Sequence, residues 1–218
     1  MQFHSYIFFD TESSIHQLSP TELVDAKTIF INEIESHSEI NVQGYATLAL
    51  KVGTKFALHM HAASFDEIQR FVRDLLHTTL GTHLRIAYAM QGIRRTSQYA
   101  SKESPAGSDP EVAHRYLVIY PFTKTTEWHL MPFEERHTIM KDHVDVGRKF
   151  SDSISQMLLY SYGVDDHEFI VSYQMDDLEE FQTLVMDMRA TESRRHTKSD
   201  VPIFTCIHLA LDEILTMV

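Results

Sequence analysis

Cysteine is almost absent from the chain. Among 218 residues there is a single one, Cys206. One thiol cannot form an internal disulfide, which agrees with a reducing compartment. Cys206 lies in the apolar run 202–207. Because a free cysteine usually behaves as a small buried hydrophobe, we expect it in the core.

Membrane and export signals are also lacking. No stretch approaches the roughly 18 apolar residues of a membrane helix. Residues 1–10 have the pattern of a strand, not of a basic and then apolar signal peptide. We therefore expect a cytoplasmic protein without membrane insertion.

Basic residues are scarce. The chain has 19 Lys and Arg against 31 Asp and Glu, a formal net charge of -12, and no Lys/Arg run comparable to a nucleic-acid arm or a polybasic membrane anchor. This balance argues against bulk DNA or RNA binding, so we expect no nucleic-acid partner. A polyanionic ligand would require the few cations to be concentrated locally.

The sequence does contain a large apolar fraction, 43%. It also contains a pattern of strands and a helix that occurs twice. Residues 56–90 and 168–209 both have the order strand, acidic turn, helix, strand. Apolar positions of the two helices recur at three- and four-residue steps, as in an amphipathic helix laid on a sheet. They match at Phe65/Leu178, Ile68/Phe181, Phe71/Leu184, Val72/Val185 and Leu75/Met188.

Each copy is preceded by another strand, helix and strand. The expected elements are a strand at 2–9, a helix from Ser19, strands at 44–50 and 115–120, a helix opened by Pro132, and a strand at 153–160. Each half thus has the ferredoxin-like order βαββαβ. The prediction is an α+β fold in which two ferredoxin-like repeats, 1–98 and 113–218, form a dimeric α+β barrel. Turn-forming residues predict a mobile linker at 99–112.

The helix after Pro132 carries a histidine on its inner face. At about 100° per residue, Arg136, Met140, His143 and Gly147 share one stripe. The glycine would let a large group approach the helix near His143. From this helix alone, a satisfied core histidine and a ligand to a bound group both remain open.

Three further residues are equally ambiguous in isolation. Gln156 shares a strand face with Ile154 and Leu158, so its amide either bonds a neighbouring loop or points into a pocket. Tyr120 and Trp128 fit a core as well as a site. His59 and His61 alternate on one strand without any partner spacing for a metal, and we expect them to be structural.

The spacing of these residues resembles the chlorite-dismutase and coproheme-decarboxylase superfamily. The resemblance runs from Tyr120 to about Arg195, whereas the first half resembles the family only in element order. The matching segments are Tyr-Pro-Phe-Thr-Lys at 120–124, Glu-Trp-His-Leu-Met-Pro-Phe-Glu-Glu-Arg at 127–136, His143, Gly-Arg-Lys-Phe at 147–150, Gly-Val-Asp-Asp at 163–166 and Met-Arg at 188–189. Many relatives have tyrosine where this chain has His129.

The resemblance implies that His143 is the proximal ligand to a haem iron. Gln156, thirteen residues later, then takes the distal position. Chlorite-degrading members have an arginine there, and losing that cation removes an electrostatic stabilisation of a few kcal/mol, so chlorite dismutase-like activity is disfavoured. Members with glutamine resemble coproheme decarboxylases.

The implied function is peroxide-dependent oxidative decarboxylation of coproheme III to haem b. Tyr120 would be the redox-active residue, Lys124 would position a propionate, and Trp128 would lie beside them. Alternatives are a haem protein of another purpose, such as a weak peroxidase, carrier or sensor, and a protein without haem whose pocket is filled by side chains.

Cations and one acid complete the implied site. Arg148 and Arg189 are candidates for the propionates, although each fits an ordinary surface ion pair too. Lys149 adds to the positive charge, and Glu192 would accept from the second nitrogen of His143. The implied partners are coproheme or haem b, hydrogen peroxide, and further copies of the chain in a homo-oligomer, by resemblance a pentamer.

Overall fold

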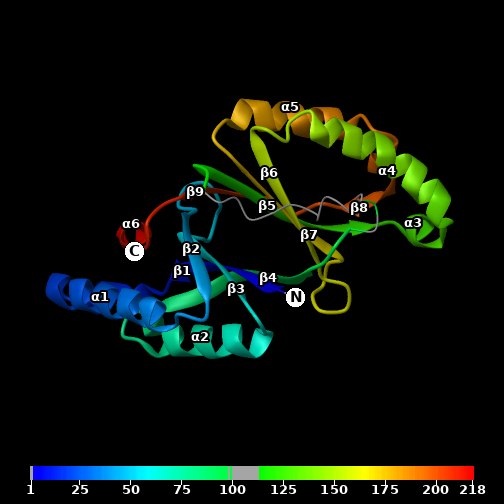
Figure 1. Ribbon diagram of the computed structural model, residues 1–218. Helices are drawn as coiled ribbons and strands as arrows, with labels where there is room; N and C mark the ends of the chain where they lie inside the picture. Colours follow the sequence, from blue (N-terminus) through cyan, green and yellow to red (C-terminus); the bar gives the residue numbers. More distant parts are fainter. Residues whose placement is uncertain (1, 98, 100–112) are drawn as a thin grey trace. The chain divides into compact units, whose positions relative to one another are not determined.

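The chain folds into two compact units. The computed structural model describes residues 2–97, 99 and 113–218. The first unit comprises Met1–Ile93 with Cys206–Val218, and the second unit comprises Arg94–Thr205. Both combine antiparallel strands with helices, which confirms the α+β class (Figure 1). The pairing of two repeats into a barrel stays a prediction.

The two units divide the chain at other residues than the sequence-based limits do: Arg94–Ser97 belong to the second unit instead of the first repeat. Cys206–Val218 groups with the first unit, whereas the sequence-based limits placed all of 113–218 in the second repeat. The reason is a pairing: Tyr45 and Ala46 lie opposite His208 and Ile207. Apart from Tyr99, the expected linker 99–112 lies outside the described residues.

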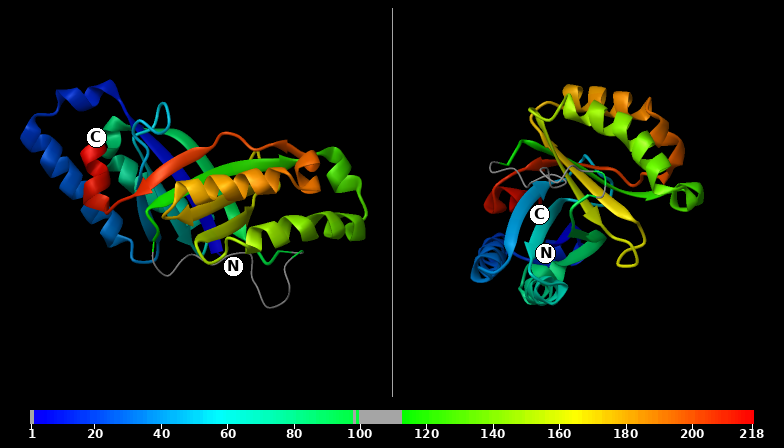
Figure 2. Two further views of the ribbon diagram at one scale, coloured as in Figure 1. Left: turned by 90° about the horizontal axis from the view of Figure 1, so that it is seen from above. Right: turned by 45° about the vertical axis from the view of Figure 1, so that its right-hand side comes forward.

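In the first unit, β3 is the central strand and pairs antiparallel with β1 and β2. Helices α1 and α2 lie together on one face of these strands (Figures 1 and 2). The bounds are β1 Gln2–Thr11, η1 Ser13–Gln17, α1 Pro20–Ser36, β2 Asn41–Ala46, β3 Phe56–Ala62, α2 Phe65–His77, η2 Gly81–His83, β4 Leu84–Arg94, β9 Phe204–His208, α6 Leu211–Ile214 and η4 Leu215–Met217.

Both long helices of this unit begin where the sequence indicates. Ser19 accepts a hydrogen bond from the Glu22 amide, while the Glu22 carboxylate accepts from the Ser19 amide. Ser64 and Glu67 repeat this arrangement at α2. Such a cap satisfies N–H groups that the first turn leaves without partners, a contribution of about 1 kcal/mol.

The strand expected at 44–50 is displaced. It spans Asn41–Ala46, and the chain then turns, because the amides of Leu50 and Lys51 both donate to the Thr47 carbonyl at 3.0 Å. Leu48 and Leu50, whose alternation suggested a strand, are 47% and 45% exposed. Apolar alternation alone cannot distinguish a strand from a turn with apolar side chains on its surface.

Buried histidines occupy the first unit. His59 is fully buried, its ring stacks on Tyr6 at 4.1 Å between centroids, and its Nε2 lies 3.1 Å from Nδ1 of His4. Burial lowers the pKa of His59 well below its ordinary value. These contacts fit a structural role. Within the described part of the chain, no helix has the length and apolar character needed to cross a membrane.

His37, at the end of α1, lies among three carboxylates. Its ring nitrogens are 3.1 Å from Glu33 and from Glu39 and 3.7 Å from Asp74 of α2. Partial burial acts to lower the pKa of His37, but the hydrogen bonds to Glu39 and Glu33 outweigh it, so the pKa is raised. A raised pKa means that protonation stabilises the folded state, and this contribution is lost as the pH rises through that pKa.

We therefore expect His37→Gln to lower the free energy of unfolding more at about pH 5.5 than at about pH 8.5. Urea unfolding of wild type and variant at both pH values measures the difference. Asp25→Asn, on the same helix, is the control and should show no such pH dependence. An equal loss at both pH values for His37→Gln would mean that the ring acts by packing alone.

In the second unit, β7 is central and pairs antiparallel with β5 and β6, while the end of β5 also pairs with β8. Helices α4 and α5 lie side by side over this sheet (Figures 1 and 2). The bounds are β5 Tyr116–Lys124, α3 Thr126–Leu130, α4 Phe133–Arg148, β6 Ile154–Tyr160, β7 Phe169–Met175, α5 Leu178–Arg189, η3 Glu192–His196 and β8 Thr197–Ser199.

Candidate functional site

Strand register gathers the predicted polar residues on one face of the second unit's sheet. Gln156 lies directly opposite Tyr173, and Tyr120 lies opposite Val171. Directly opposed residues point to the same face, and Val171 and Tyr173 share a face because they are two positions apart. The register therefore places the Tyr120 and Gln156 side chains on the same face, toward α4 and α5.

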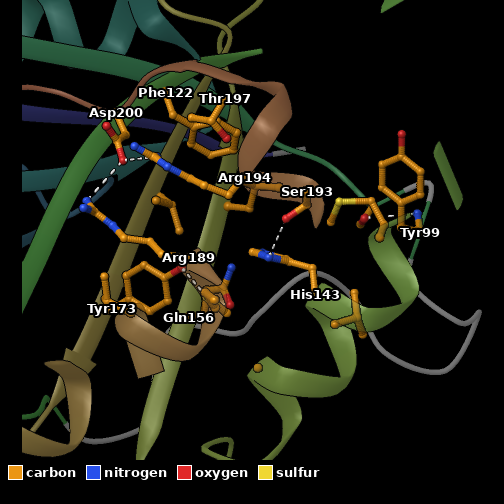
Figure 3. A pocket seen from close by; sticks show the side chains of 18 of the residues that line it. Tyr99, Phe122, His143, Gln156, Tyr173, Arg189, Ser193, Arg194, Thr197 and Asp200 are labelled. Carbon is orange, nitrogen blue, oxygen red and sulfur yellow. Dashed lines mark hydrogen bonds and ion pairs between the residues drawn. The ribbon is translucent and has the colours of Figure 1, made fainter. Parts of the chain in front are cut away.

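Between this face and the two helices lies a pocket of about 530 Å³. That volume is in the range of ligand pockets. Helix α4 contributes Met140, His143, Val144, Gly147 and Arg148, and the apolar wall is Ile154, Leu158, Val171, Val185 and Met188. Figure 3 shows His143 from α4, Gln156 from β6 and Arg189 from the end of α5 around the pocket.

Hydrogen-bond counting fixes the proton on His143. The Thr191 hydroxyl donates its single hydrogen to the Met188 carbonyl at 2.7 Å. Its 3.0 Å contact with Ser193 therefore requires the Ser193 hydroxyl to donate. With that hydrogen used, the Ser193 oxygen can only accept at its 3.0 Å contact with His143, so Nδ1 of His143 carries the proton and donates.

The consequence is an imidazole poised as a ligand. Nε2 of His143 keeps its lone pair, and no described residue hydrogen-bonds it. Burial, with a smaller effect of the Lys124 charge, lowers the pKa of His143 to about 4. The ring is therefore neutral near pH 7, which is the form that coordinates a metal ion.

Glu192 does not take the role expected for it. Its carboxylate pairs with Arg195 at 3.1 Å and is 56% exposed, while the next residue, Ser193, accepts from His143. Both belong to η3, where successive residues turn by about 120°. Neighbours in such a turn cannot face the same partner, so a neutral hydroxyl replaces the expected carboxylate.

Gly147 lies one turn after His143 and lines the pocket. A Cβ at this position would lie 3.1 Å from the terminal methyl of Met188 on α5. The glycine therefore permits the close approach of α4 and α5 as well as leaving open space beside the histidine.

Tyr120 sits beside a second tyrosine. The rings of Tyr120 and Tyr173 stack with centroids 6.2 Å apart, and both line the pocket. Burial raises the pKa of the Tyr120 phenol, which a hydrogen bond with Tyr173 partly offsets, and burial raises the pKa of Tyr173 further. Both phenols are therefore protonated near pH 7.

Lys124 ends β5 at the edge of the pocket, above the Trp128 ring, with Nζ 4.6 Å from the ring centroid. Burial lowers the pKa of Lys124 to about 8, although the Glu168 carboxylate acts in the opposite direction. Trp128 is 3% exposed and does not line the pocket, so it supports Lys124 from below. An ammonium ion over an indole face is a favourable cation–π contact.

Two arginines share one carboxylate on the pocket wall. Oδ2 of Asp200 accepts from Arg194 at 2.6 Å and from Arg189 at 3.4 Å. All three residues line the pocket (Figure 3). Of the other predicted cations, Arg148 lines the pocket and pairs with Asp145 at 3.2 Å, whereas Lys149 is exposed and does not line it.

Comparison with known proteins shows the family of this chain. The family described as chlorite dismutase matches residues 21–209. The chain belongs to the chlorite dismutase family. A coproheme decarboxylase from Mycolicibacterium smegmatis is 25% identical over 210 residues, and the match covers 93% of this chain and 90% of that protein.

Solved chlorite dismutases share the fold. The enzyme from Candidatus Nitrospira defluvii in complex with imidazole gives a TM-score of 0.91 at 23% identity, covering 99% of this chain and 94% of that one. A single-residue variant of the same dismutase gives 0.92 at 22% identity, with coverage of 99% and 94%.

The sequence did not predict several of the residues that line this pocket. Ser193, Arg194 and Asp200 were not singled out. Tyr173 carries a detectable signal, because strand alternation places its phenol on the apolar face formed by Phe169, Val171 and Met175. Asp200 has none, since its partners are recognised only once η3 has folded back beside α5.

Proposed function

We propose that this chain binds an iron porphyrin through His143 and catalyses peroxide-dependent decarboxylation of coproheme III to haem b. One observation carries the proposal: a half-buried, neutral imidazole, with Nε2 available, borders a pocket of about 530 Å³ that also holds Tyr120 and Gln156. The relative named as a coproheme decarboxylase supports the same reading.

The residues present fit such a ligand. A porphyrin needs an apolar slot for its ring, one axial donor and cations for its carboxylates. The pocket has an apolar wall, His143 as the donor, and Lys124, Arg148, Arg189 and Arg194 around it. Coproheme carries four propionates and haem b carries two, so coproheme could form more ion pairs with these cations.

Each polar residue then has a stated task. The bound iron supplies the oxidation by peroxide, while the protein supplies orientation and charge. Tyr120 would lose one electron together with its phenolic proton and take a hydrogen atom from a propionate β-carbon. Each decarboxylation removes two electrons and releases CO2, and each hydrogen peroxide accepts two electrons. Lys124 would hold the reacting carboxylate.

Gln156 favours decarboxylation over chlorite decomposition, the two activities named among the relatives. A neutral amide in the pocket offers no charge to hold an anionic oxychlorine species, so efficient chlorite decomposition is disfavoured. A weak peroxidase, a haem carrier and a haem sensor would also use His143 and Gln156. Assembly into a five-membered ring stays a prediction.

We expect purified chain mixed with ferric coproheme and then titrated with hydrogen peroxide to yield haem b, with a decrease in mass that corresponds to two CO2 and four hydrogen atoms. Two equivalents of peroxide should suffice. Haem b mixed with the same chain and peroxide is the control for non-specific oxidation. Bleaching without conversion would favour a peroxidase or carrier, and rapid oxygen release from chlorite would show that Gln156 does not exclude that reaction.

A further inference from the structure

Asp200 places a carboxylate of the protein where a ligand carboxylate would be expected to bind. It follows β8, and its Oδ2 accepts from both Arg189, at the end of α5, and Arg194, in η3. Both guanidinium groups therefore point to one oxygen on the pocket wall (Figure 3). A ligand carboxylate has the same kind of acceptor oxygens as Asp200. It can therefore replace Asp200 as the acceptor for both guanidinium groups without any change in the positions of the arginines.

The three side chains are only partly shielded from water. Asp200 is 20% exposed, Arg194 39% and Arg189 50%. Two positive charges and one negative charge leave a net charge of +1 on this part of the wall. Incomplete burial means that an arriving anion can compete for the guanidinium groups, since exposed ion pairs contribute little stability.

This charged group acts on Tyr120. Burial is the main cause of the raised pKa of the Tyr120 phenol, but Asp200 raises that pKa further, whereas Arg189 and Arg194 lower it. The group lines the same pocket as Tyr120, the residue that, under the proposed function, faces the reacting propionate. A carboxylate present on coproheme and absent from haem b would lie beside these arginines.

We propose that Asp200 is a specificity-determining residue that competes with a propionate of the substrate for Arg189 and Arg194. The inference rests on the proposed function. The substrate's carboxylate takes the arginines from Asp200 on binding, and Asp200 takes them back once that carboxylate has been lost. Asp200 thereby weakens the binding of coproheme. After the propionate has been lost, Asp200 again provides an anion for the two arginines.

The test uses metal-free porphyrins, whose fluorescence reports binding without any turnover. We expect Asp200→Asn to bind coproporphyrin III roughly tenfold more tightly than wild type, because one unit of competing charge is removed from two guanidinium groups. Its affinity for protoporphyrin IX should change by less than about threefold, since that ligand lacks the extra carboxylates. The gain should shrink as salt is added.

Asp187→Asn is the matched control, because it removes the same charge from an exposed position on α5 that does not line the pocket. It should leave both affinities unchanged. Arg194→Gln is a second variant, for which the affinity for coproporphyrin III should fall while the affinity for protoporphyrin IX changes little. It provides the test if Asp200→Asn fails to fold.

The outcomes separate the two proposals. If wild type binds both porphyrins and Asp200→Asn strengthens both equally, strengthens neither or weakens coproporphyrin III, the competition is refuted while porphyrin binding stands. If wild type binds neither metal-free porphyrin but does bind ferric coproheme, the same comparison is made with ferric coproheme and haem b. If wild type binds none of these ligands, the proposed function fails and the role of Asp200 fails with it.

Discussion

Replacing His143 with alanine is expected to abolish the Soret shift that wild-type chain gives with ferric coproheme, with binding weakened by more than about 100-fold. The reason is geometric: Nδ1 of His143 donates to Ser193, which leaves Nε2 as the donor atom available to the pocket. Absorption titration with ferric coproheme measures the loss.

The control for this variant lies on the same helix. His137→Ala removes an exposed imidazole of α4 that does not line the pocket, and it should bind ferric coproheme as wild type does. Free imidazole added to His143→Ala should restore the shift, because it returns the missing nitrogen to the space that the side chain occupied. A normal shift in His143→Ala without imidazole would rule out His143 as the axial ligand.

Replacing Tyr120 with phenylalanine should lower the rate of conversion of coproheme to haem b by at least about 1000-fold while leaving the affinity for coproheme nearly unchanged. Phenylalanine keeps the ring in its stack with Tyr173 but has no phenolic hydrogen to lose. Mass spectrometry after addition of peroxide gives the rate, and absorption titration gives the affinity.

Tyr116→Phe serves as the control, because Tyr116 lies on the same strand, β5, and does not line the pocket. It should convert coproheme at the wild-type rate. If Tyr120→Phe still forms haem b, Tyr120 is not the oxidised residue. Tyr173, whose ring centroid lies 6.2 Å away, would then be the first tyrosine to replace.

Periodicity and capping patterns were sufficient for the long helices, but they did not predict the short helices α3 and α6. The expected helix from Ser19 begins at Pro20, and the helix opened by Pro132 spans Phe133–Arg148. Local rules work here because caps and amphipathic faces depend on residues three and four positions apart. The strand expected at 44–50 was displaced because its true limits depend on pairing with β3, which no local pattern specifies.

The sequence by itself determined the α+β class, the family and the placement of His143 on the inner face of its helix, since these follow from periodicity and motif spacing. Only the tertiary structure decided which group accepts from His143 and which carboxylate holds the arginines. Two contacts depend on the orientation of the short helix η3. One is the hydrogen bond of His143 to Ser193 instead of Glu192, and the other is the pairing of Asp200 with Arg189 and Arg194. In such a helix, a shift of one residue turns a side chain by about 120°. Composition and motif spacing cannot predict that orientation.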